Sequence, residues 1–353
     1  MKDTARLETV ANTLFSTRYE TWNFGESVAF EAMVRASEVL DTARYLEFAH
    51  GWLRGWAARA EPFVRLDHTA PGFAAVHVAE KTGDDDLVTQ LTRLAEYLVS
   101  RPTLYGLFET WESSPLRAPY GPTRLDHRGA RLLANPPAGS FIDCLHFDPP
   151  FLSALGTLTG DRDLVATGVN QATTFVEVLQ DDDGFFWHFV LADTPERYGP
   201  RWGRGQGWAL LGMLDVLETI AADRQDFEAQ WQVLTSAVSD LIRAMVASQQ
   251  PDGHWPARIL SETPSHESST AAFMAAGFTR ALRMGIVSGE DIEHSRDLAL
   301  QAVHGALDDS GVLTGVSAAV MACTEPSHYD WVPTGFMVPW GQGPAVLALC
   351  EEE

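Results

Sequence analysis

The sequence predicts an all-α protein whose helices form six hairpins that close into an (α/α)6 barrel. Two long segments share one pattern, in which an apolar residue and an aspartate precede a helix, a Thr-Gly-Asp turn and a second helix. Comparable helix pairs follow one another along nearly the whole chain. Several of the helices are apolar on almost every side, which indicates that other helices surround them.

The predicted hairpins can be placed in chain order from the hydrophobic periodicity and the short glycine turns between them. We expect a pair at 26–40 and 42–60, one beginning near residue 66 and one beginning at 142. Further pairs are expected at 204–220 with 227–248 and at 266–284 with 289–304. The two ends of the chain, 4–20 and 333–351, each supply one more helix. The segment between Trp111 and Asp143 reads as a long loop.

The helices fall into two classes, which indicates two layers. Stretches such as STAAFMAAGFTRAL and GPAVLALC have no polar face, whereas DDDLVTQLTRLAEYL is amphipathic. An open solenoid has the same repeat, but it would leave its last inner helix uncovered. The very apolar C-terminal helix therefore favours closure against the N-terminal helix. We expect residues 1–353 to form one domain.

Composition and charge exclude several kinds of partner. A net charge of −23 argues against nucleic acid and anionic membranes. No apolar run is long enough to cross a bilayer, and the N-terminus lacks the pattern of a secretory signal. The three widely spaced cysteines suggest reduced thiols and a cytoplasmic location. The sequence itself sets no oligomeric state.

Aromatic and hydrogen-bonding residues gather at the starts of the inner helices. In a closed ring these starts converge at one end, which would collect Trp22, Asp67, Asp143, Arg204, His266 and Trp331. Aromatic faces that stack on a sugar ring, beside carboxylates and amides that take its hydroxyls, are typical of a carbohydrate site. The positive ends of the helices would also favour an anion.

Each of these residues also has a purely structural interpretation. Asp67 and Asp143 could be N-caps, His188 could be a packed core histidine, and Trp202 and Trp208 could be core aromatics. Arg204 is harder to dismiss, because a buried guanidinium needs a carboxylate from the protein or from a ligand. The histidines His68, His127, His146 and His266 lack the compact spacing of a zinc motif, so we expect no metal and no other cofactor.

The sequence resembles the unsaturated uronyl hydrolases of glycoside hydrolase families 88 and 105. The resemblance is carried by LDHTAPG with KTGD, FIDCLHFDPPFL with LTGD, DGFFWHF, WGRGQGWALLGMLDVLE and HESSTAAFMAAG, in the family's order. It implies an (α/α)6 barrel. It also implies hydration of the C4=C5 enol ether in the unsaturated uronic acid that a polysaccharide lyase leaves at the non-reducing end of an oligosaccharide.

The resemblance assigns roles to particular residues. Asp143 matches the acid/base, which gives a proton to C4 and then takes one from the attacking water, and Asp67 matches the family's second aspartate. The substrate-contacting positions fall on His188, Trp202, Arg204 and Trp208, with Trp22 and Gln206 as weaker candidates. We expect the two tryptophans Trp202 and Trp208 to stack on sugar rings, and Arg204 and His188 to bind the uronate or its hydroxyls.

Two alternatives and several departures remain open from the sequence. The same barrel could house an ordinary inverting glycosidase or a sugar epimerase with Asp67 and Asp143 as separate acid and base, or a sugar-binding protein without turnover. The roles of His127, His146 and Asp148 do not follow from the family pattern. RGQGW does not separate family 88 from family 105, and neither the aglycone nor the linkage follows from the sequence.

Overall fold

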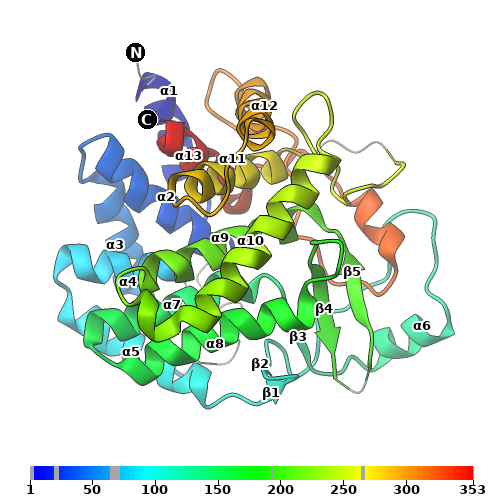
Figure 1. Cartoon of the computed structure of the whole chain (residues 1–353), viewed down its shortest axis with the longest axis horizontal. Helices are drawn as coiled ribbons and strands as arrows, with labels where there is room; N and C mark the ends of the chain where they lie inside the picture. Colours follow the sequence, from blue (N-terminus) through cyan, green and yellow to red (C-terminus); the bar gives the residue numbers. More distant parts are fainter. Residues whose placement is uncertain (1–3, 20–23, 64–71, 193, 264–266, 353) are drawn as a thin grey trace.

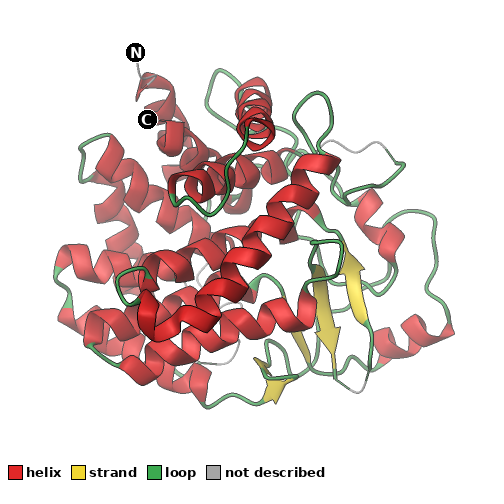
Figure 2. Ribbon diagram, viewed as in Figure 1, coloured by secondary structure: helices red, strands yellow, loops and turns green. Residues whose placement is uncertain are grey.

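The computed structural model describes residues 4–19, 24–63, 72–192, 194–263 and 267–352, and their helices form the predicted barrel (Figures 1 and 2). The inner helices are α2 (Gly25–Val39), α4 (Phe73–Thr82), α7 (Cys144–Thr159), α9 (Gly203–Ile220), α11 (Ser268–Arg283) and α13 (Pro339–Glu352). Each contacts the next in this order, and α13 contacts α2. The ring is therefore closed, which confirms the barrel and excludes the open solenoid.

The outer layer is formed by the second helix of each hairpin. Its members are α1 (Thr4–Phe15), α3 (Arg44–Ala57), α5 (Asp85–Val99), α8 (Arg162–Leu179), α10 (Glu228–Ser248) and α12 (Glu290–Ala306). Five of them pack on the inner helix that precedes them, and α1 packs on α13 from the opposite end of the chain. The two chain ends thus complete the sixth hairpin, as the sequence predicts.

The Thr-Gly-Asp turns have a physical explanation at each residue. Gly83 and Gly160 end α4 and α7 with φ angles of +63° and +75°, a left-handed conformation that glycine adopts without steric cost. The next residue caps the following helix, because Asp84 and Asp161 each accept a hydrogen bond at 3.0 Å from a backbone N–H of its first turn. The motif therefore joins two antiparallel helices with a minimal turn.

Close packing of the inner helices depends on small residues. A side chain on Gly212 of α9 would come within 2.3 Å of the carbonyl oxygen of Leu145 on α7, so only glycine allows these helices to approach. Both helices are buried over nearly their whole surface. Each Leu or Phe buried in this way contributes roughly 1.5–3 kcal/mol to folding.

Two small sheets interrupt the helical pattern. The strands β1 (Thr103–Leu104) and β2 (Leu107–Phe108) form a hairpin. Antiparallel strands β3 (Gly139–Phe141), β4 (Trp187–Leu191) and β5 (Arg197–Pro200) form a second sheet in that order, beside the helices in Figure 2. The segment predicted as a loop between Trp111 and Asp143 instead contains α6 (His127–Ala134) and β3. Short helices η1 (Arg224–Phe227) and η2 (Pro326–Trp331) complete the elements.

Other sequence expectations can be checked against the described residues. None of the described helices combines the length and the hydrophobicity that a membrane span requires. Cys144, Cys323 and Cys350 are all buried, and no disulfide joins any of them within the described residues.

Asp148 lies inside α7 and has almost no solvent exposure. Its Oδ1 atom has no hydrogen-bond partner among the described residues, and burial raises its pKa from 3.8 to about 8. The carboxyl is therefore protonated in the folded protein at neutral pH.

This placement predicts a specific pH dependence of stability. Between pH 4 and pH 8 the folded state holds a proton on Asp148 that the unfolded state releases, so the free energy of unfolding falls as the pH rises, by up to about 1.4 kcal/mol per pH unit. Urea unfolding of Asp148→Asn should show a shallower decline than the wild type over this range, whereas Asp163→Asn, at an exposed position, should not. Parallel curves for Asp148→Asn and wild type would contradict the assignment.

Candidate active site

The three-stranded sheet brings together two predicted site residues that are far apart in sequence. Phe141 on β3 pairs with Phe189 on β4, and the backbone N–H of Ile142 donates to the carbonyl of His188 at 2.8 Å. Asp143 directly follows Ile142, and His188 directly precedes Phe189. The sheet thus sets the position of His188 relative to the start of α7.

Asp143 stands at the N-terminus of α7 but does not cap it. Its backbone is already helical, and its side chain accepts no capping hydrogen bond, in contrast to Asp84 and Asp161. The side chain is 15% exposed, and its Oδ2 lies 3.4 Å from Nε2 of His188. That oxygen has no aligned hydrogen bond among the described residues. The structural interpretation of Asp143 as an N-cap is therefore wrong.

His188 is held from behind by Tyr329 of η2. The Tyr329 hydroxyl lies 2.6 Å from Nδ1 of the ring, and both side chains are buried. Burial raises the pKa of Tyr329 well above 10, so the hydroxyl keeps its proton. The backbone of Cys323 also hydrogen-bonds this hydroxyl and lowers its pKa, as an N–H donor does. The phenol proton is then donated to Nδ1, which leaves Nε2–H facing Asp143.

Trp202 and Arg204 lie beside this pair at the start of α9. The Trp202 ring centroid is 4.4 Å from that of His188, and the Arg204 guanidinium lies 5.1 Å from the Trp202 ring. Arg204 is fully buried, and burial lowers its pKa, an effect that Glu267 and Asp143 oppose. A buried positive charge therefore lies close to the Asp143 carboxyl.

The carboxylate that Arg204 requires is Glu267, which precedes α11. Glu267 lies 3.6 Å from the guanidinium, and Arg204 also donates to the carbonyl of Ala318 at 2.8 Å. The same carboxylate accepts from the backbone N–H of Thr270 at 2.9 Å and of Ser317 at 3.1 Å. Burial acts to raise the pKa of Glu267, but the positive charge of Arg204 and the hydrogen bonds to the carboxylate lower it below its usual value. Glu267 thus fixes Arg204 while capping a helix.

Two of the predicted substrate contacts have structural surroundings instead. Trp208 has no exposed surface, because its ring packs against Phe147, Phe273 and His146, so sugar stacking on this ring does not fit the structure. The Gln206 side chain donates to two backbone carbonyls at 3.0 Å and accepts from the Phe186 N–H at 2.8 Å. Its two N–H donors are therefore both used within the protein.

The other candidates are placed less favourably or not at all. Asp67 and Trp22, with His68 and His266, lie outside the residues that the structure describes. His127 is exposed at the start of α6, and Trp331 at the end of η2 is 47% exposed. His146 lies deeper in the barrel, with Glu31 and Asp215 close enough for the three to act as metal ligands.

Two site residues were missed from the sequence. Tyr329 falls in HYDWVPTGF, where the aromatic residues gave no sign of which one faces inward. Glu267 falls in SHESST, and a Glu followed by Ser and Thr at a helix start is a signal for a cap. That signal could have identified Glu267 as a cap, but it could not reveal its pairing with Arg204.

The arrangement is suited to proton transfer at an anionic ligand. Asp143 offers a carboxyl oxygen that has no hydrogen bond from any residue the structure describes. The imidazole of His188 can stabilise the carboxylate form by donation from Nε2, and Tyr329 keeps it in the required tautomer. The guanidinium of Arg204, paired with Glu267, is fixed beside them in a water-poor environment, where electrostatic interactions are stronger than in solution.

Known proteins match the chain over almost its entire length. The model of Glycosyl Hydrolase Family 88 matches residues 4–353. Unsaturated rhamnogalacturonyl hydrolase YesR from Bacillus subtilis (strain 168) is 23% identical over 332 residues, which cover 94% of this chain and 89% of YesR.

Two solved structures share the fold. A possible member of the GH105 family from Salmonella enterica has a TM-score of 0.84 at 19% identity, covering 99% of this chain and 92% of its own. The unsaturated glucuronyl hydrolase from Bacillus sp. GL1, responsible for the degradation of glycosaminoglycan, has a TM-score of 0.70 at 16% identity and covers 99% and 95%.

The tautomer of His188 can be measured directly. In long-range ¹H–¹⁵N spectra of protein labelled at histidine, we expect the His188 ring to carry its proton on Nε2, because Tyr329 donates to Nδ1. Tyr329→Phe should weaken this preference. Tyr120→Phe removes a hydroxyl that contacts Arg117 instead and should leave the signal unchanged. A proton on Nδ1 in the wild type would refute the assignment.

Proposed function

This chain belongs to Glycosyl Hydrolase Family 88, and we propose that it removes a 4,5-unsaturated uronic acid from the non-reducing end of lyase-generated oligosaccharides. The observation that carries this proposal is the position of the Asp143 carboxyl, which does not cap α7. Its Oδ2 lies 3.4 Å from Nε2 of His188, and the Tyr329 hydroxyl lies 2.6 Å from Nδ1 of the same ring. The named activities of YesR and of the Bacillus sp. GL1 enzyme, both on unsaturated uronyl substrates, are of the same kind.

The proposed reaction begins at the C4=C5 bond, which is an enol ether because the ring oxygen is attached to C5. Asp143 transfers its proton to C4, and the ring oxygen stabilises the cation that forms at C5. Water then adds to C5 and gives a proton to the Asp143 carboxylate. The resulting hemiketal opens, and the aglycone leaves from C1. One carboxyl serves as acid and then as base, so no second carboxylate at a fixed separation is needed.

His188 and Tyr329 are proposed to act on the charged form of Asp143. When Asp143 loses its proton, the Nε2–H of His188, 3.4 Å away, can stabilise the new carboxylate. This interaction is stronger in the charged transition state than in the neutral ground state, which is the condition for accelerating the reaction. Tyr329 is a positioning residue in this scheme, since its hydroxyl occupies Nδ1.

The remaining predicted residues take supporting roles in the proposal. The positive charge of Arg204, held by Glu267, attracts the uronate carboxylate toward the start of α9. Trp202 is also buried, so it forms the apolar wall against which His188 rests rather than an open platform for a sugar ring. Asp67 and Trp22 are proposed, from the resemblance alone, to bind the substrate from the segments before α4 and α2. Trp208 and Gln206 hold the wall in place.

The activity can be tested by following the absorbance of the enol ether. We expect wild-type protein to remove the ultraviolet absorbance of lyase-digested pectin or glycosaminoglycan oligosaccharides. Asp143→Asn should lower kcat by a factor of about 10³ or more, because the amide cannot supply the proton. Asp161→Asn alters an aspartate that caps α8, and asparagine caps a helix about as well, so this variant should keep nearly the wild-type stability and the wild-type rate.

The same assay separates the proposal from its alternatives. Turnover of saturated glycosides, with the unsaturated products untouched, would indicate an ordinary glycosidase. Binding of the oligosaccharide without any loss of absorbance would indicate a sugar-binding protein. An Asp143→Asn variant that kept the full rate would show that another group supplies the proton.

The activity should also respond to the hydroxyl of Tyr329. Tyr329→Phe is expected to reduce kcat by about 10-fold with little change in KM, and to shift the pH–rate profile, since His188 then no longer keeps one tautomer. Tyr120→Phe should reproduce the wild-type profile. If Tyr329→Phe changed KM alone, Tyr329 would be a binding residue rather than a positioning residue.

A further inference from the structure

A second group of polar side chains lies inside the barrel, away from Asp143. Glu31 of α2, His146 of α7 and Asp215 of α9 each offer one ligand atom, and these atoms lie within 4.8 Å of one another. Nε2 of His146 is 3.1 Å from Oε2 of Glu31 and 3.8 Å from Oδ2 of Asp215. Asp215 follows Arg204 by about three turns of α9, roughly 16 Å along the helix.

One tautomer of His146 directs a lone pair at the two carboxylates. In this tautomer Ser27 donates its hydroxyl proton to the carbonyl of Phe24 at 2.9 Å and accepts from Nδ1 of His146 at 3.2 Å. Nε2 then has no proton of its own, and three electron-rich atoms face one another. A metal ion would select this tautomer, because it binds the lone pair of Nε2.

Arg280 of α11 holds the outer oxygens of the same carboxylates. Its guanidinium lies 2.5 Å from Oδ1 of Asp215 and 3.4 Å from Oε1 of Glu31. The inner Oδ2 of Asp215 is fully buried and has no hydrogen-bond partner among the described residues. Metal-binding carboxylates and histidines are commonly oriented by such outer hydrogen bonds. Ser27 and Arg280 stand where these outer partners are expected.

The charges of the cluster do not balance. Glu31, Asp215 and Glu218 all contact the guanidinium of Arg280, and Arg283 also reaches Glu218 at 3.7 Å. With a neutral His146, the three carboxylates and two guanidiniums sum to −1. A bound cation would offset this excess negative charge.

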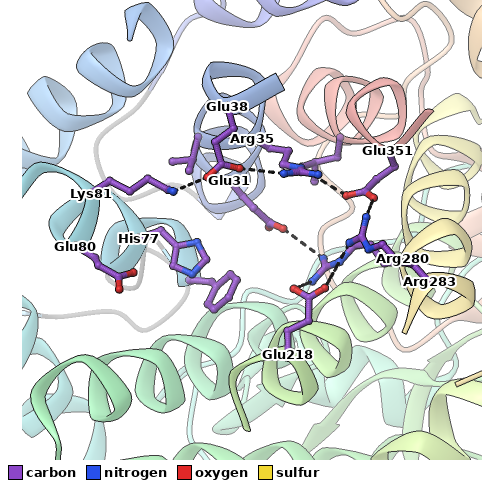
Figure 3. Close-up of a pocket in the computed structure, with 13 residues that line it drawn as sticks. Glu31, Arg35, Glu38, His77, Glu80, Lys81, Glu218, Arg280, Arg283 and Glu351 are labelled. Carbon is purple, nitrogen blue, oxygen red and sulfur yellow. Dashed lines mark hydrogen bonds and ion pairs between the residues drawn. The ribbon is translucent and has the colours of Figure 1, made fainter. Parts of the chain in front are cut away.

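A pocket reaches this cluster at Glu31, the ligand that lines it. It has a volume of about 240 Å³ and opens where the inner helices end, at the opposite end of α9 from Arg204. Figure 3 shows Glu31 and Arg280 directed into it, with Glu218 beside them. Three basic residues at its rim, Arg35, Lys81 and Arg283, form ion pairs with Glu38 and Glu351. The ion pair of Glu31 is formed with Arg280 instead.

We propose that Glu31, His146 and Asp215 bind one divalent transition-metal ion, best matched by Zn²⁺. One imidazole nitrogen with two carboxylate oxygens suits zinc, whereas Mg²⁺ and Ca²⁺ prefer oxygen ligands alone. Ligands of a tetrahedral zinc stand about 3.3 Å apart, close to the separations of 3.1 and 3.8 Å found here. Water from the pocket completes the coordination.

The ion would tie three inner helices together rather than take part in the hydrolysis. Its ligands come from α2, α7 and α9. The sequence expectation of no metal rested on compact ligand spacing, and here the ligands lie on helices far apart in the chain. This proposal is independent of the proposed function, because Asp143 is not a ligand.

Zinc titration of the full-length chain tests the proposal. After removal of metals with a chelator and dialysis, calorimetry with ZnCl₂ should show one site per chain with a Kd in the micromolar range or tighter. Saturating zinc should raise the thermal midpoint. Glu31→Gln, which preserves the shape of the side chain, and His146→Ala should each weaken zinc binding by about 100-fold or more and abolish the rise.

Matched variants make the result specific. His77→Ala removes a histidine that lines the same pocket without being one of the three ligands, so it should bind zinc as the wild type does. Asp143→Asn should do so as well, even if the proposed function is wrong. Circular dichroism verifies that each variant is folded. If His146→Ala does not fold, the result for Glu31→Gln decides the question.

Three outcomes would overturn the proposal. The first is the absence of saturable zinc binding in the wild type, which would assign the neutralising charge to protons. The second is binding that persists in Glu31→Gln, as expected if zinc is held by the cysteines, which all variants retain. The third is binding that His77→Ala weakens as much as Glu31→Gln does.

Discussion

Closure of the inner ring is the constraint on which the rest of the structure depends. Helices such as α7, α9 and α13 have almost no polar face, so each must have neighbours on every side. In a ring each inner helix has two inner neighbours and an outer partner, and α13 gains its second neighbour only by meeting α2. The starts of the neighbouring helices α7 and α9 bring Asp143 and Arg204 to the same end of the ring, and the three-stranded sheet places His188 beside them.

The sequence predicts the architecture well because its signals are local. Helix periodicity and the Thr-Gly-Asp turns are read within a few residues, and Gly83, Asp84, Gly160 and Asp161 carry out the turn and cap functions that their types indicate. The α6 helix and the β3 strand were not predicted, because they lie in a segment between hairpins that has no counterpart in the other repeats. The sheet matters all the same, since it sets the position of His188.

The candidate site was predicted only in part, for a different physical reason. Asp143, His188 and Arg204 were identified by residue type and resemblance, but their partners Tyr329 and Glu267 are defined by contacts between distant segments. Residue type also misleads where burial is complete. Trp208 has the chemistry of a sugar platform, yet packing against Phe147 and Phe273 leaves it no open face. A sequence gives the chemistry of a side chain but not its surroundings.

The pairing of α1 with α13 has a consequence for how the chain folds. This hairpin joins two helices that are far apart in sequence, and α2 also packs on α13. The side of α2 that contacts α13 is therefore covered only once α13 has formed, and these contacts have a very large sequence separation. We expect late, slow closure from a nearly complete arc of hairpins.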